Sequence, residues 1–275
     1  MDNKKQWDIL LLSGDFNHID ILSSYISDES LGSYLNDDRV IYYFTPGKKP
    51  LIETILNKYI NTYDISFSWD VQEDKDWHLT WKDNFKPIEI NKDLIIIPDW
   101  DNEIYNHKDI IKIKPGMAFG TGHHETTFLM IQHLIKNIEG KKSVLDLGSG
   151  SGILSIISHK YGADKIVAIE IDDDCRDNFF ENLQLNHINK DEIDFRISDV
   201  LSFRDLEYDI ILANINKNII KELIPNFQNT KAKILLSGIL EEDQIEIESL
   251  IKLHGMNLIY KDQYNEWVLM VIEND

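Results

Sequence analysis

The sequence predicts an α/β protein in which a doubly wound, mostly parallel β-sheet follows a smaller α+β module. Three observations support this fold class. Apolar residues lead into three glycines at alternate positions within Val144–Gly152, and the helical pattern Ile153–Ile157 follows directly. From Ser143 onward, apolar segments that suit strands alternate with segments that suit helices. Only residues 262–265 separate the last two apolar segments, and so short a connection requires an antiparallel hairpin.

The first part of the chain has a different periodicity, which predicts a ferredoxin-like β-α-β-β-α-β module. Strands are expected at residues 7–12, 31–35, 39–44 and 65–69, and helices at 19–26 and 51–59. Modules of this fold bind RNA or proteins, and the fold alone does not decide between them. Residues 1–73 hold 12 acidic and 6 basic side chains, so we expect a protein ligand.

A linker helix is expected after this module. Trp77, Trp81 and Phe85 recur at every fourth residue, which places them on one face of a helix, and Pro87 ends that helix. We therefore divide the chain into a first domain, an interdomain helix and a second domain, at residues 1–72, 73–85 and 86–275.

The second domain is predicted to begin with two short strands, at residues 88–90 and 94–97. A seven-stranded sheet with one antiparallel strand follows, and helices are expected between most of its strands. These strands are expected near residues 143–147, 165–170, 192–197, 208–213, 232–237, 256–261 and 266–272.

The glycine-rich turn predicts a cofactor site at the carboxyl edge of the sheet. Dinucleotide enzymes favour G-x-G-x-x-G, whereas here the third glycine comes one residue earlier. The tighter turn resembles the loop of class I S-adenosylmethionine (AdoMet) methyltransferases, in which Gly148 and Gly150 would admit a cofactor without phosphate. Glu170 ends the next strand, and its carboxylate suits the hydroxyls of a ribose. The alternative is a glycine turn in another kind of α/β protein.

Two polar residues are candidates for the same edge of the sheet. Asn214 ends the fourth strand, where its amide can accept hydrogen bonds from an attacking amine and orient it for methyl transfer. Its alternative role is to cap a helix that begins at Lys217. Asp199 ends the third strand and could accept a hydrogen bond from an adenine amino group, or lie in a surface loop.

A segment rich in glycine and threonine, residues 114–127, leads into another expected helix. Thr127 is the best-placed hydroxyl for the amino-acid end of the cofactor, because helix N-termini favour anionic groups. The run His123–Glu125 suggests zinc, but it lacks the second histidine of an H-E-x-x-H pattern. No metal site is therefore expected.

The composition limits the range of functions. The formal net charge of −20 opposes non-specific nucleic-acid binding, so no direct nucleic-acid recognition is expected. No run of 18 apolar residues and no signal-peptide pattern is present, so neither a membrane span nor export is expected. The single cysteine, Cys175, fits a reducing cytoplasm and is interpreted as a half-buried small residue.

Several motifs together resemble the bacterial ribosomal protein L11 methyltransferase family (PrmA). The element Pro115–Gly122, which reads P-G-M-A-F-G-T-G, is the most discriminating, because methyltransferases in general lack it. The other matching elements are Trp77–Pro87, Ile97–Trp100, Leu145–Gly152, Ala213–Ile215 and Leu236–Leu240. These elements occur along the chain in the same order as in the family, whereas the first domain matches in expected fold and position only.

The resemblance implies a class I methyltransferase domain that uses AdoMet to methylate lysine side chains and an N-terminal α-amine of ribosomal protein L11. It implies cofactor contacts at Thr127, Gly148, Glu170 and Asn214, and docking of the substrate by the first domain. The substrate could be free L11 or L11 on the large ribosomal subunit. We expect a cytoplasmic, monomeric enzyme.

Two alternatives to this function remain open at the level of sequence. One is a class I methyltransferase that acts on another protein, an RNA or a small molecule, and the other is a non-catalytic binding protein. The chain also departs from the residues that are common in the family. Ser149 stands where cysteine is common, Glu170 where aspartate is common, and Asn216 where leucine is common.

Overall fold

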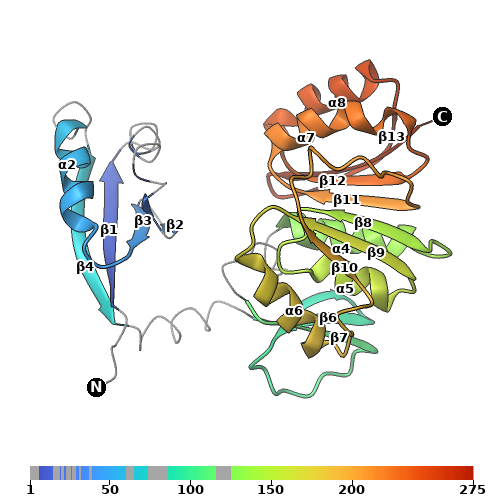
Figure 1. The fold of residues 1–275 in the computed structure, drawn as a ribbon, viewed down its shortest axis with the longest axis horizontal. Coiled ribbons are helices and arrows are strands. Elements are labelled where there is room, and N and C mark those ends of the chain that lie inside the picture. The colour runs from blue at the N-terminus through green and yellow to red at the C-terminus, as the bar shows by residue number, and fades with distance from the viewer. Residues whose placement is uncertain are drawn as a thin grey trace. The chain divides into compact units, whose positions relative to one another are not determined.

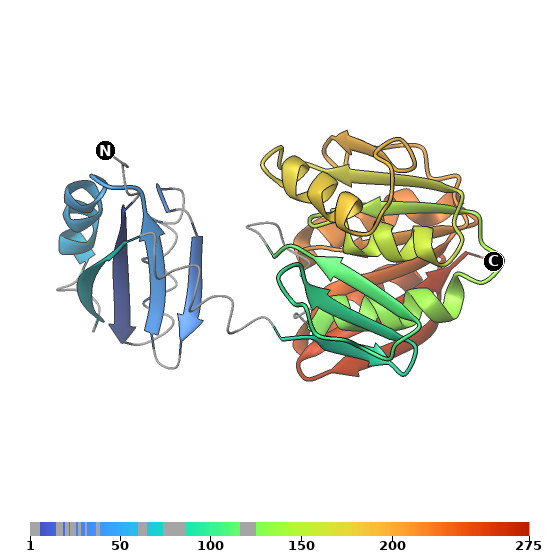
Figure 2. The same cartoon turned by 90° about the horizontal axis from the view of Figure 1, so that it is seen from below.

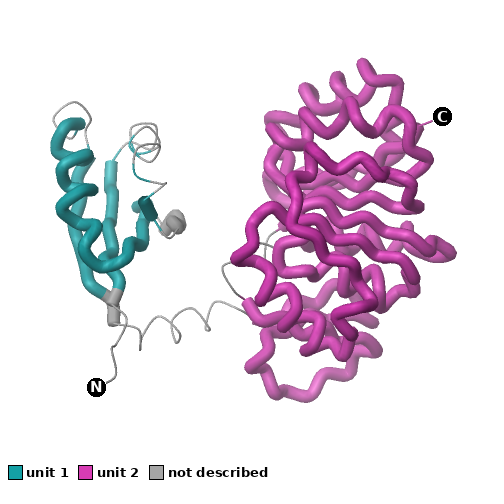
Figure 3. The backbone as a smooth tube through the Cα atoms, viewed as in Figure 1, with its two compact units in different colours: residues 1–84 teal, residues 85–275 magenta. Residues whose placement is uncertain are grey.

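The structure, a computed structural model, describes residues 6–14, 19, 22, 26, 29–30, 32–36, 39–59, 65–73, 86–115 and 125–274. The chain separates into two compact units, residues 1–84 and 85–275 (Figure 3). Of the linker helix predicted for residues 73–85, only Glu73 is described, and it ends strand β4. Most of the P-G-M-A-F-G-T-G element also lies outside the described residues.

Unit 1 contains a four-stranded antiparallel sheet with the strand order β2-β3-β1-β4, which is that of a ferredoxin-like fold. Its described elements are β1 (Gln6–Gly14), β2 (Gly32–Asn36), β3 (Arg39–Phe44), α2 (Lys49–Tyr59) and β4 (Ile65–Glu73). The core consists of Leu10, Leu12, Ile19, Leu22, Ile26, Tyr42, Phe44, Ile52, Leu56 and Ile65. Three of these residues, at positions 19, 22 and 26, come from the segment predicted as the first helix.

Unit 2 contains a seven-stranded sheet with the order β10-β9-β8-β11-β12-β14-β13. Strand β14 runs antiparallel to both of its neighbours, β12 and β13, and the other pairs are parallel, which confirms the predicted fold class. The strands are β8 (Ser143–Leu147), β9 (Lys165–Glu170), β10 (Asp194–Ile197), β11 (Ile210–Asn214), β12 (Lys233–Leu240), β13 (Asn257–Tyr264) and β14 (Trp267–Glu273).

Helices cover both faces of this sheet, which explains why its central strands are almost wholly apolar (Figure 1). One face packs against α4, α5 and α6, and the other against α7 and α8. The helices are α4 (Glu125–Asn137), α5 (Ile153–Lys160), α6 (Cys175–Leu185), α7 (Lys217–Leu223) and α8 (Gln244–Leu253), with short 3₁₀ helices η2 (Ile224–Asn229) and η3 (Glu241–Asp243). Within the described part of the chain, no helix is long and apolar enough to cross a membrane.

A separate three-stranded sheet packs against the helices on the α4, α5 and α6 side of the large sheet (Figures 1 and 2). It consists of β5 (Ile88–Asn91), β6 (Leu94–Pro98) and β7 (Asp109–Ile113). The first two strands are where the sequence predicted them. The third, which runs parallel to β6, was not anticipated, because the charged residues Asp109 and Lys112 interrupt its apolar pattern.

The register of the large sheet aligns the predicted site residues at the carboxyl ends of neighbouring strands. Leu147 of β8 pairs with Ile169 of β9 and with Ala213 of β11. The next residues, Glu170 and Asn214, therefore end their strands beside the turn that follows β8. The strand order reverses at β8, and ligands of open α/β sheets bind at such a reversal.

Candidate functional site

A cavity of about 550 Å³ lies at the carboxyl ends of the central strands, within the size range of small-ligand pockets. The turn after β8 contributes Gly148 and Gly150, β9 contributes Glu170, the loop after β10 contributes Asp199, and β11 contributes Asn214. The structure thus brings together five of the six residues that the sequence predicted for cofactor binding.

Backbone conformation and steric contacts explain why this turn requires glycine. Gly148, Gly150 and Gly152 all have positive φ, at 75°, 51° and 81°, a region that other residues rarely adopt. A Cβ atom on Gly148 would lie 2.3 Å from Cγ2 of Ile215, and one on Gly152 would lie 2.7 Å from the ring of Phe179. The turn therefore lies close to its neighbours on two sides, and no side chain fits at either position.

Glu170 is only 8% exposed, and its carboxylate is held by three backbone N–H groups. Oε2 accepts from Gly150 at 2.9 Å, and Oε1 accepts from Ile171 at 2.8 Å and from Asp172 at 3.1 Å. A carboxylate has about four acceptor positions, so capacity remains for a ribose hydroxyl. Glu170 also fixes the glycine turn to the end of β9, a second role that the sequence did not reveal.

Asn214 has one paired and one unpaired group. Its Nδ2 donates to Oγ1 of Thr127 at 3.2 Å, while its Oδ1 is buried and has no hydrogen-bond partner among the described residues. The predicted alternative, that Asn214 caps the following helix, is wrong. Asn216 is the N-cap of α7, and its Oδ1 accepts from the backbone N–H of Asn218 at 2.8 Å.

The first turn of α4 contributes two threonines with different surroundings. Thr126 lines the cavity and was not among the predicted site residues. Thr127 is fully buried and supports the amide of Asn214. Neighbouring helical residues point about 100° apart, so the two side chains face different partners. The histidines considered for zinc, His123 and His124, lie outside the described residues.

Asp146 is a buried acid that was not among the predicted site residues. It is 1% exposed, and its Oδ2 accepts from Oγ of Ser155 at 2.7 Å. Burial raises the pKa of the Asp146 carboxyl to about 7; the Ser155 hydrogen bond opposes this increase in pKa, and the charge of Glu170 adds to it. Its Oδ1 and the hydroxyl of Ser149 are both buried without a partner in the described part of the chain. A lone acid in the strand sequence V-L-D-L was the signal that could have identified it.

Two further observations concern single residues at the cavity. Asp199 lines the cavity and also accepts a hydrogen bond at 2.9 Å from the backbone of Leu201. Cys175 lines it too, and burial together with nearby carboxylates raises the pKa of its thiol to about 11. A protonated thiol is a poor nucleophile, which agrees with its interpretation as a small packing residue.

The cavity suits a nucleoside cofactor with an amine substrate beside it. Its walls offer a carboxylate at β9 for sugar hydroxyls, glycine backbone for close approach, and an unpaired amide oxygen at β11. Ile215, Ile219 and Trp267 add apolar wall beyond Asn214, which suits the methylene chain of a long side chain.

Comparison with known proteins agrees with this geometry. The sequence model of the family described as ribosomal protein L11 methyltransferase (PrmA) matches residues 19–275. The ribosomal protein L11 methyltransferase of Lactobacillus gasseri is 31% identical over 266 residues, which cover 92% of this chain and 82% of that protein. The one from Ruminiclostridium cellulolyticum is 34% identical over 262 residues, or 90% and 83% of the two chains.

A solved structure gives the same result at the level of the fold. The crystal structure of ribosomal protein L11 methylase from Lactobacillus delbrueckii subsp. bulgaricus superimposes with a TM-score of 0.63 at 30% sequence identity. The match covers 70% of this chain and all of that chain. The chain belongs to the ribosomal protein L11 methyltransferase family.

Proposed function

We propose that this protein transfers methyl groups from AdoMet to amines of ribosomal protein L11, on lysine side chains and on the N-terminal α-amine. The observation that carries this proposal is the unpaired, buried Oδ1 of Asn214 on the wall of the cavity. An oxygen acceptor at that place suits an incoming N–H group. Membership of the family supports L11 as the substrate, and action in the cytoplasm follows from that substrate.

The residues around the cavity would divide the binding of AdoMet among them. Glu170 would accept from the ribose hydroxyls, and Asp199 from the adenine amino group. Gly148 and Gly150 would bring backbone atoms close to the cofactor, and Thr126 and Thr127 lie at the N-terminus of α4, where a carboxylate is favoured. The bound cofactor supplies a methyl group that an amine can attack.

The chain's contribution to the chemistry would be alignment. A free lysine has a pKa of about 10.4, so the amine must lose a proton before it attacks. Oδ1 of Asn214 would accept an N–H bond of the neutral amine and so direct its lone pair toward the methyl group. Bound AdoMet would supply the methyl group by cleavage of its S–C bond, with S-adenosylhomocysteine as the leaving group, and water would take the extra proton from nitrogen. Positioning of this kind is the main catalytic effect expected for an in-line displacement.

Unit 1 would dock the substrate protein. Its ferredoxin-like fold is compatible with RNA or protein, but its excess of acidic over basic residues disfavours RNA.

The test is intact-mass spectrometry of unmodified ribosomal protein L11 after incubation with this protein and AdoMet. We expect mass increases in steps of one methyl group, with the sites then assigned by fragmentation. An unchanged mass, with AdoMet binding intact, would refute L11 as the substrate and favour another protein, an RNA or a small molecule. Failure to bind AdoMet would favour a non-catalytic binding protein. Protein-free ribosomal RNA is incubated in parallel, and its methylation would favour an RNA substrate.

A further inference from the structure

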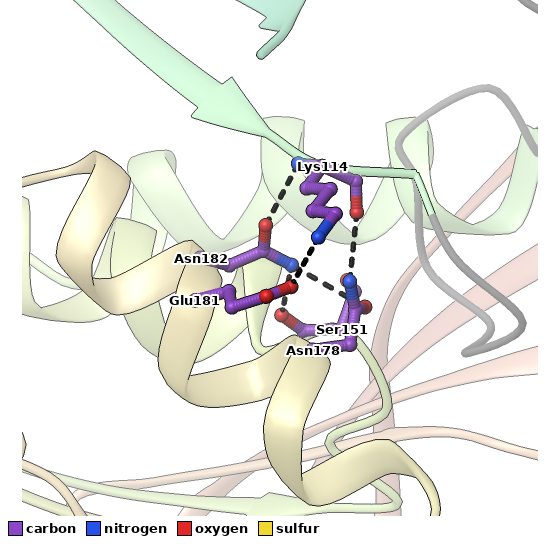
Figure 4. A network of polar contacts seen from close by, with 5 residues as sticks. All are labelled: Lys114, Ser151, Asn178, Glu181 and Asn182. Carbon is purple, nitrogen blue, oxygen red and sulfur yellow. Dashed lines mark hydrogen bonds and ion pairs between the residues drawn. The ribbon is translucent and has the colours of Figure 1, made fainter.

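Helix α6 lies between the glycine turn and the end of β7, and one of its side chains bonds to both (Figure 4). Asn182 is fully buried. Its Oδ1 accepts from the backbone N–H of Lys114 at 2.7 Å, and its Nδ2 donates to the backbone carbonyl of Ser151 at 2.9 Å. Ser151 is the residue between Gly150 and Gly152 of the turn.

The same face of α6 holds Lys114 at three points. Besides the bond to Asn182, the Lys114 carbonyl accepts from Nδ2 of Asn178 at 2.9 Å, and its Nζ lies 2.8 Å from Oε2 of Glu181. One helical turn further on, Asn186 accepts from the N–H of Lys112 at 3.0 Å and donates to its carbonyl at 2.7 Å.

These bonds form a regular ladder between a helix and the free edge of a strand. Four residues of α-helix rise about 6 Å, and two residues of strand extend about 6.6 Å. Asn182 and Asn186 therefore stay in step with Lys114 and Lys112, and their amides occupy the place of a neighbouring strand. Asn182 extends this ladder to the glycine turn through the Ser151 carbonyl.

Contacts at the other end of α6 lead to the cavity. Its first residue, Cys175, lines the cavity, and the ring of Phe179 lies beneath Gly152. The contact with Phe179 limits how closely the turn approaches α6. Because an apolar contact is not directional, it does not fix the orientation of the turn. The hydrogen bond from Asn182 to the Ser151 carbonyl supplies a directional link.

We propose that Asn182 is a positioning residue for the cofactor site: it fixes the glycine turn between α6 and the end of β7, and thereby sets the affinity for AdoMet. This inference rests on the proposed cofactor site. Asn182 itself does not line the cavity and acts through the backbone of Ser151.

The test compares one chemical change at two steps of the ladder. Asn182→Asp keeps the acceptor for Lys114 but places a second oxygen against the Ser151 carbonyl. Asn186→Asp, at the C-cap of α6, makes the same change against the carbonyls of Lys112 and Asn182 without touching the glycine turn. We expect Asn182→Asp to raise the AdoMet dissociation constant about tenfold, the effect of losing one such hydrogen bond. We expect Asn186→Asp to leave it within about twofold of the parent.

Calorimetric titration with AdoMet, below the unfolding temperature of each variant, gives the dissociation constants, and urea unfolding gives stability. A purely structural role would lower stability in both variants and leave both affinities unchanged, which would overturn the proposal. Equal losses of affinity in the two variants would overturn it as well. If Asn182→Asp does not fold, Asn182→Ser replaces it, because serine also removes the bond to Ser151 without burying a charge. A parent protein that does not bind AdoMet would refute the proposed function instead.

Discussion

At the scale of the residue, two asparagines that lie two positions apart between β11 and α7 have separate roles. Asn216 uses its side chain to cap α7, so the cap does not require Asn214. The amide of Asn214 is instead oriented by Thr127, with its oxygen left unpaired among the described residues. A buried acceptor without a partner is costly, and a substrate N–H would remove that cost.

Asn214→Ala should lower turnover roughly 100-fold, because the amine loses the group that aligns it. The affinity for AdoMet should change much less, since Glu170 and the glycine turn remain. Turnover at saturating AdoMet with L11 as substrate, together with AdoMet titration, gives both quantities. Turnover equal to that of the parent would exclude a catalytic role for Asn214.

The protonation of Asp146 makes the stability of the folded protein depend on pH. Its pKa is raised to about 7 in the folded protein, above an unfolded value of about 3.9. The folded state therefore binds more protons than the unfolded state between these two pH values. The stability that the protonated carboxyl contributes is complete below about pH 3.9 and is lost as the pH rises through about 7.

Asp146→Asn should remove this loss, because the amide keeps an acceptor for Ser155 and does not ionise. Between pH 5 and 6, the unfolding free energy of the variant relative to the parent should rise by about 1.3 kcal/mol per pH unit, and at pH 7 by about half that slope. Above pH 8 the difference should be constant. Urea unfolding of both proteins across this range measures it, and a difference independent of pH would show that Asp146 does not titrate there.

At the scale of the element, the ends of three strands meet around one residue. Ile215 follows β11, and its side chain lies where a Cβ on Gly148, after β8, would be. Gly238 in β12 has a φ of 92°, and a Cβ there would lie 2.1 Å from the carbonyl oxygen of Ile215. Both glycines allow the chain after β11 to pass between its neighbours, and this path determines where Asn214 lies.

Gly238→Ala should therefore displace the segment that carries Asn214. We expect turnover to fall tenfold or more, roughly the effect of a small misplacement of a catalytic group. Stability should fall by about 1–2 kcal/mol from the positive φ, and by roughly 1–3 kcal/mol more from the collision.

The matched control for this variant is Gly162→Ala. Gly162 has a φ of 96°, but a Cβ there would meet nothing within 4 Å. It should show the φ penalty alone, with turnover close to that of the parent. If the two variants have the same turnover and the same stability in urea, the contact with Ile215 does not position Asn214.

At the scale of the whole molecule, each unit has a hydrophobic core of its own. Unit 1 packs around residues of β1, β3 and α2, and unit 2 has one apolar cluster on each face of its large sheet. Units of this kind can fold independently. All described residues that line the cavity at the carboxyl ends of the strands belong to unit 2.

A fragment of residues 85–275 should fold and bind AdoMet within about twofold of the full chain. Its kcat/KM toward L11 should fall roughly 100-fold or more, because docking energy from unit 1 would be lost. Calorimetry and the methylation assay measure the two quantities. Full activity of the fragment toward L11 would contradict the role proposed for unit 1.

Much of this architecture could be predicted because its signals are local in the sequence. Apolar runs located the seven strands of the large sheet, and the short connection after β13 identified the antiparallel strand. The glycine spacing located the turn after β8, and Glu170 and Asn214 were placed at the cavity because each is a polar residue at the end of such a run. Strand β7 was missed because the charged residues Asp109 and Lys112 interrupt its short apolar pattern.

The sequence by itself determined the fold class, the family and the side chains at the carboxyl ends of the strands, since these depend on residue order and periodicity. Only the tertiary structure decided how those side chains are used. The cap belongs to Asn216, Glu170 holds the turn of Gly150, and Asn182 joins segments that lie 31 and 68 residues away along the chain. Hydrogen bonds and steric contacts of this kind depend on distances in space, which residue order alone does not specify.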